Sequence, residues 1–162
     1  MDDYIIKDND GNLLISIQNN EENGLLNCQY LTHCLAVVKV NNDYLLGWNK
    51  WRKRWEIFGG CIEKYETARE CIARECFEEL GIQNVDFKYI GNMKLLLMPD
   101  YFSQEERIEH GALYGVTLES ITIEEIFNQI KDREEITKLA LYSQVSGKEP
   151  ISQIDEKLLE YY

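Results

Sequence analysis

The feature that most constrains this chain is an acidic stretch bounded by glycines. The stretch GGCIEKYETARECIARECFEELGI, residues 59–82, carries six glutamates in 24 residues. Gly59-Gly60 is typical of the end of a strand, Thr67 with Glu70 forms a capping-box pattern, and Gly81 is typical of a helix C-terminus. The sequence therefore predicts a strand, a loop and then a helix that ends before Gly81.

Three of these glutamates share one face of the predicted helix. Because an α-helix has 3.6 residues per turn, Glu75, Glu78 and Glu79 fall within an arc of about 100°. Two carboxylates about 4 Å apart repel by roughly 4 kcal/mol at an effective dielectric near 20, so a compensating cation is expected. Oxygen ligands without histidine or cysteine favour Mg²⁺ or Mn²⁺ over zinc. The alternative is a solvated helix face without a ligand.

Composition narrows the classes of function. The chain has 162 residues and 44% hydrophobic content, which suits one domain with its own core. Lys and Arg number 17 against 29 Asp and Glu, a balance that disfavours a nucleic-acid partner. No stretch resembles a signal peptide or reaches the roughly 18 apolar residues of a membrane span. We therefore expect a cytoplasmic protein with no membrane partner, in which a phosphate-bearing substrate needs help from a cation.

The cysteines and histidines argue against other chemistries. The five cysteines contain no C-x-x-C pair and are odd in number, so they predict free thiols that are mostly buried. His33 and His110 have no cysteine or histidine partner at ligand spacing. A zinc site or a Ser-His-Asp triad is therefore disfavoured.

Strand and helix patterns alternate along the chain. Asp-Gly in residues 8–11 predicts a hairpin between strands, and residues 41–43 predict a second one. The predicted strands are 4–7, 12–18, 33–40, 44–48, 55–58, 85–98 (long or bulged), 111–119 and 136–142. An acidic loop is predicted over 99–110, an amphipathic helix after Thr122, and a closing helix over 152–160. This order predicts an α/β fold with a sheet covered by helices on both faces.

The spacing of the acidic stretch resembles that of a known family. Gly60 is followed after five residues by Glu66, and then after seven residues by Arg74-Glu75-Cys76-Phe77-Glu78-Glu79-Leu80-Gly81-Ile82. This resembles the Nudix box, G-x5-E-x7-R-E-U-x-E-E-x-G-U, at every fixed charged and glycine position. The resemblance extends more loosely over residues 31–142. We therefore predict a MutT-type Nudix hydrolase domain over 31–162, with residues 1–30 as an N-terminal β-hairpin extension of the same domain.

The resemblance implies a fold and a cation site. It implies a Nudix-type α/β/α sandwich with a mixed sheet between helices, and Mg²⁺ or Mn²⁺ as cofactor. The ligands that it implies are the box carboxylates and the loop backbone: Glu75, Glu78, Glu79 and a carbonyl of Gly59 or Gly60. Arg74 would orient the carboxylates, and Glu66 would fix the geometry of the loop and helix.

It also implies a reaction. A Nudix pyrophosphohydrolase cleaves the diphosphate linkage of a nucleoside diphosphate derivative, such as a nucleoside triphosphate, an oxidised dNTP or ADP-ribose, by in-line attack of water on phosphorus. The catalytic residues implied are Glu75, Glu79, Arg74 and Glu66. The general base is either Glu75 in the box or a carboxylate from a downstream loop, for which the candidates are Glu105, Glu106 and Glu109.

Substrate contacts are expected in the basic, aromatic stretch before the box. Residues 48–55 contain four cations and three tryptophans, and such a loop suits phosphate and a flat base. The candidates are Lys50, Trp51, Arg52 and Arg54. A core position is expected for Trp55 instead.

Several alternatives stay open from the sequence. The chain could be a nucleotide-binding regulatory Nudix module or an isopentenyl-type diphosphate isomerase, although the intact box favours the hydrolase. The N-terminal hairpin either completes the sheet or forms a homodimer contact.

Overall fold

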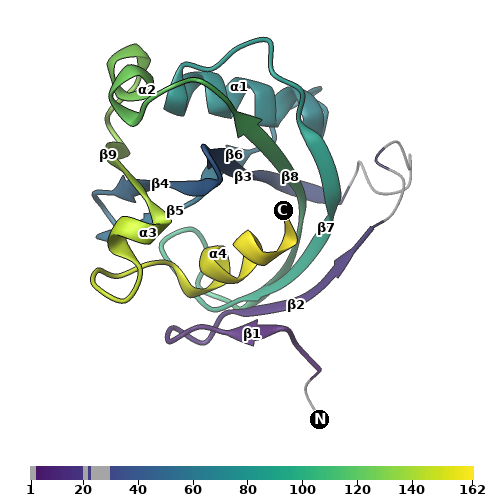
Figure 1. Ribbon diagram of the computed structural model, residues 1–162. Helices are drawn as coiled ribbons and strands as arrows, with labels where there is room; N and C mark the ends of the chain where they lie inside the picture. Colours follow the sequence, from purple (N-terminus) through teal and green to yellow (C-terminus); the bar gives the residue numbers. More distant parts are fainter. Residues whose placement is uncertain (1–2, 20–21, 23–29) are drawn as a thin grey trace.

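One mixed sheet forms the middle of the molecule (Figure 1). The computed structural model describes residues 3–19, 22 and 30–162, so parts of the predicted N-terminal extension, and Cys28, lie outside the described residues. The strands are β1 (Ile6–Lys7), β2 (Leu13–Gln18), β3 (Leu31–Val40), β4 (Asp43–Asn49), β5 (Arg54–Glu56), β6 (Phe58–Cys61), β7 (Lys88–Leu97), β8 (Arg107–Leu118) and β9 (Ile136–Leu141). Their order is β1-β2-β7-β8-β3-β4-β5, with β6 paired to β3 and β9 paired to β4.

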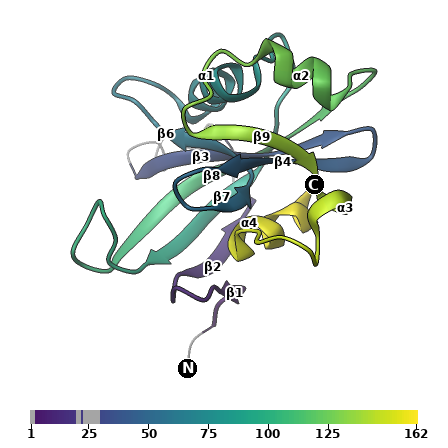
Figure 2. The same ribbon diagram turned by 90° about the vertical axis from the view of Figure 1, so that its left-hand side faces the viewer.

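Helices cover both faces of this sheet, as Figure 2 shows. They are α1 (Ala68–Leu80), α2 (Ile123–Gln129), α3 (Tyr142–Val145), α4 (Gln153–Leu158) and the 3-10 helix η1 (Leu159–Tyr161). One apolar core joins α1 and α2 to the sheet, and a second joins α3, α4 and η1 to the opposite face. The predicted α/β/α arrangement is therefore confirmed. No helix in the described part of the chain is both long and apolar enough to cross a bilayer.

The sheet is mixed because of one strand pair. β3 and β8 run parallel, whereas their other ladders, to β4, β6 and β7, are antiparallel. The strand predicted over 85–98 as long or bulged is β7, which has a bulge, since its register against β8 shifts between Tyr89 and Gly91. The long ladders of β8 with β3 and β7 hold together segments that lie far apart in sequence.

The N-terminal hairpin adds two strands to one edge of the sheet. β1 pairs antiparallel with β2, and β2 pairs antiparallel with β7. The side chain of Asp8 accepts hydrogen bonds from the backbone N–H groups of Asp10 and Asn12, which closes the turn. The described strands of the hairpin therefore complete the sheet, which is one of the two roles that the sequence left open.

Three elements differ from the sequence prediction. β8 begins at Arg107, inside the loop predicted over 99–110. The charged residues at its start do not show a strand pattern in the sequence, although they pair with β7. The predicted strand 55–58 is two strands, β5 and β6, separated at Ile57, whose N–H donates to Asp155 and not to a strand. Helix α3 has four residues, too few to produce a helical pattern in the sequence.

The described thiols match the prediction of free cysteines. Cys34, Cys71 and Cys76 are buried, Cys61 is exposed, and all four are free. The sulfur atoms of Cys34 and Cys71 lie 2.6 Å apart.

Candidate active site

Helix α1 carries the acidic motif and is fixed at both ends. At its start, Thr67 Oγ1 accepts from the N–H of Glu70 at 3.1 Å, and Glu70 Oε1 accepts from the N–H of Thr67 at 3.2 Å, which confirms the capping box. At its end, Gly81 has φ 68°, a left-handed conformation that favours glycine, and donates to Phe77 O at 2.8 Å. The buried residues that anchor the helix are Cys71, Ile72, Cys76 and Leu80. The motif glutamates are therefore held on the face beside this buried edge.

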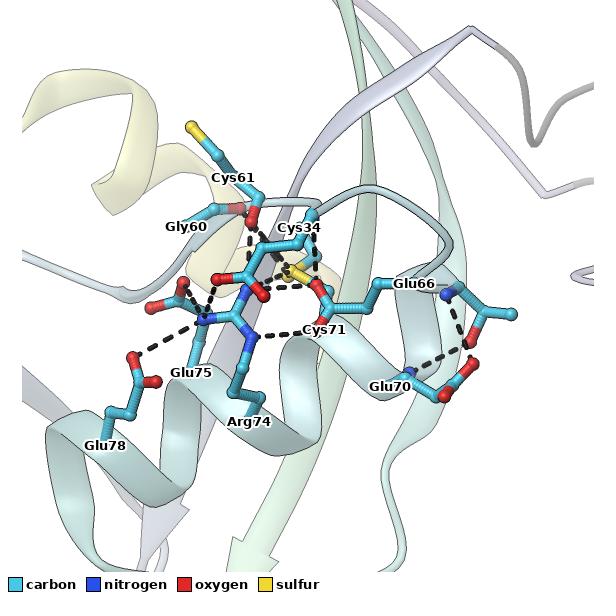
Figure 3. Close-up of polar contacts among 11 residues, drawn as sticks. Cys34, Gly60, Cys61, Glu66, Glu70, Cys71, Arg74, Glu75 and Glu78 are labelled. Carbon is cyan, nitrogen blue, oxygen red and sulfur yellow. Dashed lines mark hydrogen bonds and ion pairs between the residues drawn. The ribbon is translucent and has the colours of Figure 1, made fainter.

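Arg74 is the centre of the charged network (Figure 3). Its guanidinium contacts Glu66 at 2.7 and 3.0 Å, Glu75 at 2.8 Å and Glu78 at 3.4 Å. It also donates to the carbonyl of Cys61 at 3.0 Å, so one side chain ties the loop after β6 to α1. These contacts suit the role predicted for Arg74, which is to orient the carboxylates, and the role predicted for Glu66, which is to fix the loop and helix.

The loop backbone meets the helix carboxylates directly. The N–H of Gly59 donates to Glu79 Oε1 at 2.9 Å. Gly60 leaves no room for a side chain, because a Cβ there would collide with the carboxylate of Glu75. The carbonyl oxygen of Gly60, a predicted ligand, lies 3.7 Å from the sulfur atoms of both Cys34 and Cys71.

These carboxylates line a cleft of about 990 Å³. This volume lies at the upper end of the range for small-molecule sites, about 300–1,000 Å³. Its charged lining comes from six separate parts of the chain and comprises Asp10, Arg52, Arg54, Glu56, Glu75, Glu79, Asp100, Glu135 and Asp155. The cleft therefore joins the motif to residues far from it in sequence.

The electrostatics of Glu75 and Glu79 favour a cation. Burial raises the pKa of Glu75, which Arg74 partly opposes, and nearby Glu78 and Glu135 raise it further. Burial also raises the pKa of Glu79 well above its usual range, against the lowering effect of its bond from Gly59. Desolvated carboxylates near other carboxylates are stabilised in the ionised form by a divalent cation.

The carboxylates of the cleft fit a hard cation whose coordination shell also includes water and substrate oxygens. Among the residues that the structure describes, no three His, Cys, Asp or Glu side chains converge closely enough to hold an ion by themselves. Mg²⁺ typically keeps several waters and binds through one or two carboxylates together with substrate phosphates. Glu75 and Glu79 in the cleft match that requirement, whereas Glu78 is about half exposed and faces Arg74.

The predicted substrate residues divide into two pairs. Arg52 and Arg54 line the cleft, where each donates to Glu56 at 2.8 Å. Trp51 is 63% exposed, and neither it nor Lys50 lines the cleft. The Nζ atom of Lys50 lies 5.4 Å from the centre of the Trp51 ring, so these two side chains contact each other.

The loop carboxylates considered as general base lie outside the cleft lining. Glu105 and Glu106 are exposed, and Glu109 lies within β8 and not in a loop. Glu109 accepts from Arg107 Nε at 2.9 Å. None of the three lines the cleft with Glu75 and Glu79, whereas Glu135 does.

Sequence reasoning missed five acidic residues of the cleft, which are Asp10, Glu56, Asp100, Glu135 and Asp155. Glu56 is buried on β5, Asp155 belongs to α4, and Glu135 directly precedes β9. Glu135 accepts from Asn49 Nδ2 at 2.9 Å. Only Glu56 could have been singled out from the sequence, because it is a charged residue between Trp55 and Ile57 in a predicted core strand.

Comparison with solved structures supports this fold. The pyrophosphohydrolase BsRppH of Bacillus subtilis superposes with a TM-score of 0.68 at 18% identity, covering 96% of this chain and 93% of that chain. A MutT NUDIX hydrolase from Burkholderia pseudomallei has a TM-score of 0.58 at 17% identity, covering 80% and 95%. The NUDIX domain of Shewanella oneidensis NrtR, complexed with ADP ribose, has a TM-score of 0.61 at 14% identity, covering 81% and 84%. At these identities the likeness concerns the fold.

Comparison with curated proteins gives no match. The sequence profile of the NUDIX domain, however, matches residues 32–162, most of the chain. The box geometry, the fold and this match agree, and they confirm the family predicted from the spacing of the glutamates. The chain belongs to the Nudix family of hydrolases.

Proposed function

We propose that this chain is a divalent-cation-dependent hydrolase that cleaves the diphosphate linkage of a nucleoside diphosphate derivative by attack of water on phosphorus. The observation that carries the proposal is the composition of one cleft, in which Glu75 and Glu79 share the lining with Arg52 and Arg54. Carboxylates suit a cation and arginines suit phosphate oxygens. A diphosphate needs both.

The box residues supply the cation site. Glu75 and Glu79 would hold Mg²⁺ or Mn²⁺, which when bound neutralises phosphate oxygens and activates water. Glu78, the third predicted ligand, would have to turn away from Arg74 to join them. Arg74 positions Glu75, and the N–H of Gly59 positions Glu79. These contacts hold both carboxylates before substrate arrives, which lowers the cost of forming the reactive arrangement.

The arginines supply phosphate contacts. An arginine has five N–H donors, and within the described residues Arg54 uses only its Nε, in the bond to Glu56. Arg52 uses one terminal nitrogen for Glu56. Their remaining N–H groups are available for phosphate oxygens, and Glu56 keeps both guanidinium groups in place.

Glu135 is the loop carboxylate best placed to act as general base. It lines the cleft together with Glu75 and Glu79, and its charge raises the pKa of both. A general base must lie within reach of the attacking water, directly or through one other water. Glu105, Glu106 and Glu109, which do not line the cleft, are weaker candidates.

The substrate class follows from the family and the cleft together. The solved NUDIX domain of NrtR binds ADP ribose, a nucleoside diphosphate joined to a further group. Nucleoside triphosphates, oxidised dNTPs and ADP-ribose are therefore the substrates to test first. The cytoplasmic location stays a prediction, and the homodimer contact stays an open alternative.

The test is a panel of these nucleotides, with Mg²⁺ or Mn²⁺, in which release of phosphate and of nucleotide is measured. We expect turnover of one class, and we expect Glu79→Gln to abolish it. Glu119→Gln is the matched control, because Glu119 is exposed and lies outside the cleft. Binding of nucleotide without turnover would support the regulatory module, and isomerisation of an isopentenyl-type diphosphate would support the isomerase.

A further inference from the structure

Two exposed aromatic rings stand at the rim of the cleft. Tyr101 is 97% exposed and Phe102 is 80% exposed, and both line the cleft beside Met98 and Pro99. Their ring centres lie 5.5 Å apart, with the ring planes nearly perpendicular. Large aromatic side chains this accessible, next to a cleft, are typical of a binding surface. We call residues 98–102 the aromatic turn.

The aromatic turn is held by its own hydrogen bonds. The side chain of Asp100 accepts from the N–H groups of Phe102 at 2.9 Å and Ser103 at 3.1 Å. Arg107 donates to the other oxygen of Asp100 at 3.0 Å. Because the backbone is fixed in this way, less conformational entropy is lost when a ligand contacts the rings.

The N-terminal hairpin forms the other support of the aromatic turn. Asn12 Oδ1 accepts from the N–H of Met98 at 2.8 Å, and Asn12 Nδ2 donates to Asp8 at 2.9 Å. Asp10 and Asn12 also line the cleft. These residues precede 32–162, the part of the chain that matches the family profile. The hairpin is therefore built into the wall of the cleft.

The cationic side chains of the cleft lining come from residues 52–54 and not from the aromatic turn. Within the described part of the chain, they are Arg52 and Arg54. The charged side chains at the aromatic turn and the hairpin turn are acidic, Asp100 and Asp10. Asp100 is already paired with Arg107 at 3.0 Å, so among the described residues this end of the lining presents no cationic side chain to a phosphate, whereas an uncharged flat ring can stack there.

We propose that the aromatic turn, held by Asn12 of the N-terminal hairpin, is a stacking site for the planar base of the substrate. This inference rests on the proposed function, since it divides one nucleotide between two parts of the cleft. The phosphates lie toward Arg52, Arg54 and the box glutamates, and the base lies against Tyr101 and Phe102. The hairpin turn thereby contributes to the choice of substrate.

The first test compares ligands with and without a base. Isothermal titration measures the affinity of the full chain for AMP, GMP and CMP against ribose 5-phosphate, in the presence of Mg²⁺. Stacking on an aromatic side chain is worth about 1–3 kcal/mol per base, so Tyr101→Ala with Phe102→Ala is expected to weaken nucleotide binding at least fivefold. Binding of ribose 5-phosphate should change less than twofold. Equal weakening of both kinds of ligand, or none, would overturn the proposal.

Tyr65→Ala is the matched control. Tyr65 is 92% exposed and does not line the cleft, so its removal should leave nucleotide affinity unchanged. Tyr101→Phe, which keeps the ring, should retain most of the affinity. A loss in Tyr65→Ala equal to that in the aromatic-turn variant would contradict a specific stacking site.

Asn12→Ala tests the role of the hairpin. The substitution removes the acceptor for the Met98 N–H but leaves both rings in the chain, so it should weaken nucleotide binding while ribose 5-phosphate binding is kept. Circular dichroism and the melting temperature verify folding. If the nucleotide affinity of folded Asn12→Ala equals that of the wild type, the hairpin has no part in the site.

Kinetics separate this inference from the proposed function. In the aromatic-turn variant, KM for the hydrolysed nucleotide should rise at least fivefold while kcat stays within about twofold. Wild-type hydrolysis with KM unchanged in this variant would overturn the stacking site alone. Base-dependent binding without any hydrolysis by the wild type would overturn the hydrolase and leave the stacking site intact.

Discussion

Arg74 holds both carboxylate oxygens of Glu66, with Nε 2.7 Å from Oε2 and a terminal nitrogen 3.0 Å from Oε1. Glu66 also accepts from the N–H of Glu63 at 3.0 Å, so the pair fixes the loop between β6 and α1. The hydrogen bonds from Arg74 are the main reason that the pKa of Glu66 falls from 4.5 to about 2. The folded protein therefore prefers ionised Glu66 more strongly than the unfolded chain does.

This preference predicts a particular loss of stability in acid. Because the folded pKa lies below the unfolded one, the contribution is complete above about pH 4.5 and is lost as the pH falls toward about 2. In Glu66→Gln it is absent, so the melting temperature should fall less between pH 6 and pH 3 than in the wild type. Glu119→Gln, at an exposed site, should follow the wild type. Parallel curves for all three proteins would contradict the prediction.

Gly60→Ala should reduce activity more than stability. The added Cβ collides with the carboxylate of Glu75, and misplacement of a reacting group by about 1 Å can cost roughly 100-fold in rate. We expect a fall in kcat of at least tenfold, measured on the substrate found in the panel. Gly147→Ala is the control, because Gly147 has φ 73° with no heavy atom within 4 Å of an added Cβ. That variant should melt at a lower temperature yet keep its kcat, and an equal loss of kcat in both would refute the argument.

Glu135→Gln tests the general base. A positioned general base contributes roughly 100- to 10,000-fold to the rate, so kcat should fall by at least 100-fold while KM changes little. Glu105→Gln should behave as wild type, because Glu105 is exposed outside the cleft lining. The reverse ranking of the two variants would move the base to the loop before β8.

Asp155→Asn should stabilise the protein at alkaline pH. Asp155 accepts from the N–H of Ile57 at 2.9 Å, and burial, followed by the charge of Glu56, raises the pKa of Asp155 from 3.8 to about 7. The folded state then holds this proton more tightly than the unfolded state, so the free energy of unfolding falls as pH rises from about 4 to about 7. Asparagine keeps the acceptor without the charge.

Urea denaturation at pH 5 and pH 8 measures this effect. The wild type should lose more stability between the two pH values than Asp155→Asn does. Asp86→Asn removes an exposed carboxylate, and its loss should equal that of the wild type. A difference between pH 5 and pH 8 that Asp155→Asn does not reduce would rule out this source of pH dependence.

The parts of the site that were predictable are local in sequence. The capping box of Thr67 and Glu70, the stop at Gly81 and the shared face of Glu75 and Glu79 all follow from helix geometry within a few turns. The basic stretch 48–55 shows the limit of this reasoning. Its composition indicated phosphate binding, but it did not show that Arg52 faces the cleft while Trp51 faces solvent.

The sequence by itself determined the family and the helix with its acidic face, because each depends on spacing along one element. Only the tertiary structure decided which distant residues complete the cleft. Asn12, Glu135 and Asp155 come from a hairpin turn, a loop and a C-terminal helix. They lie near the motif because burial of two apolar cores packs helices against both faces of one sheet. Contacts between residues that are distant in sequence produce no periodic pattern from which they could be predicted.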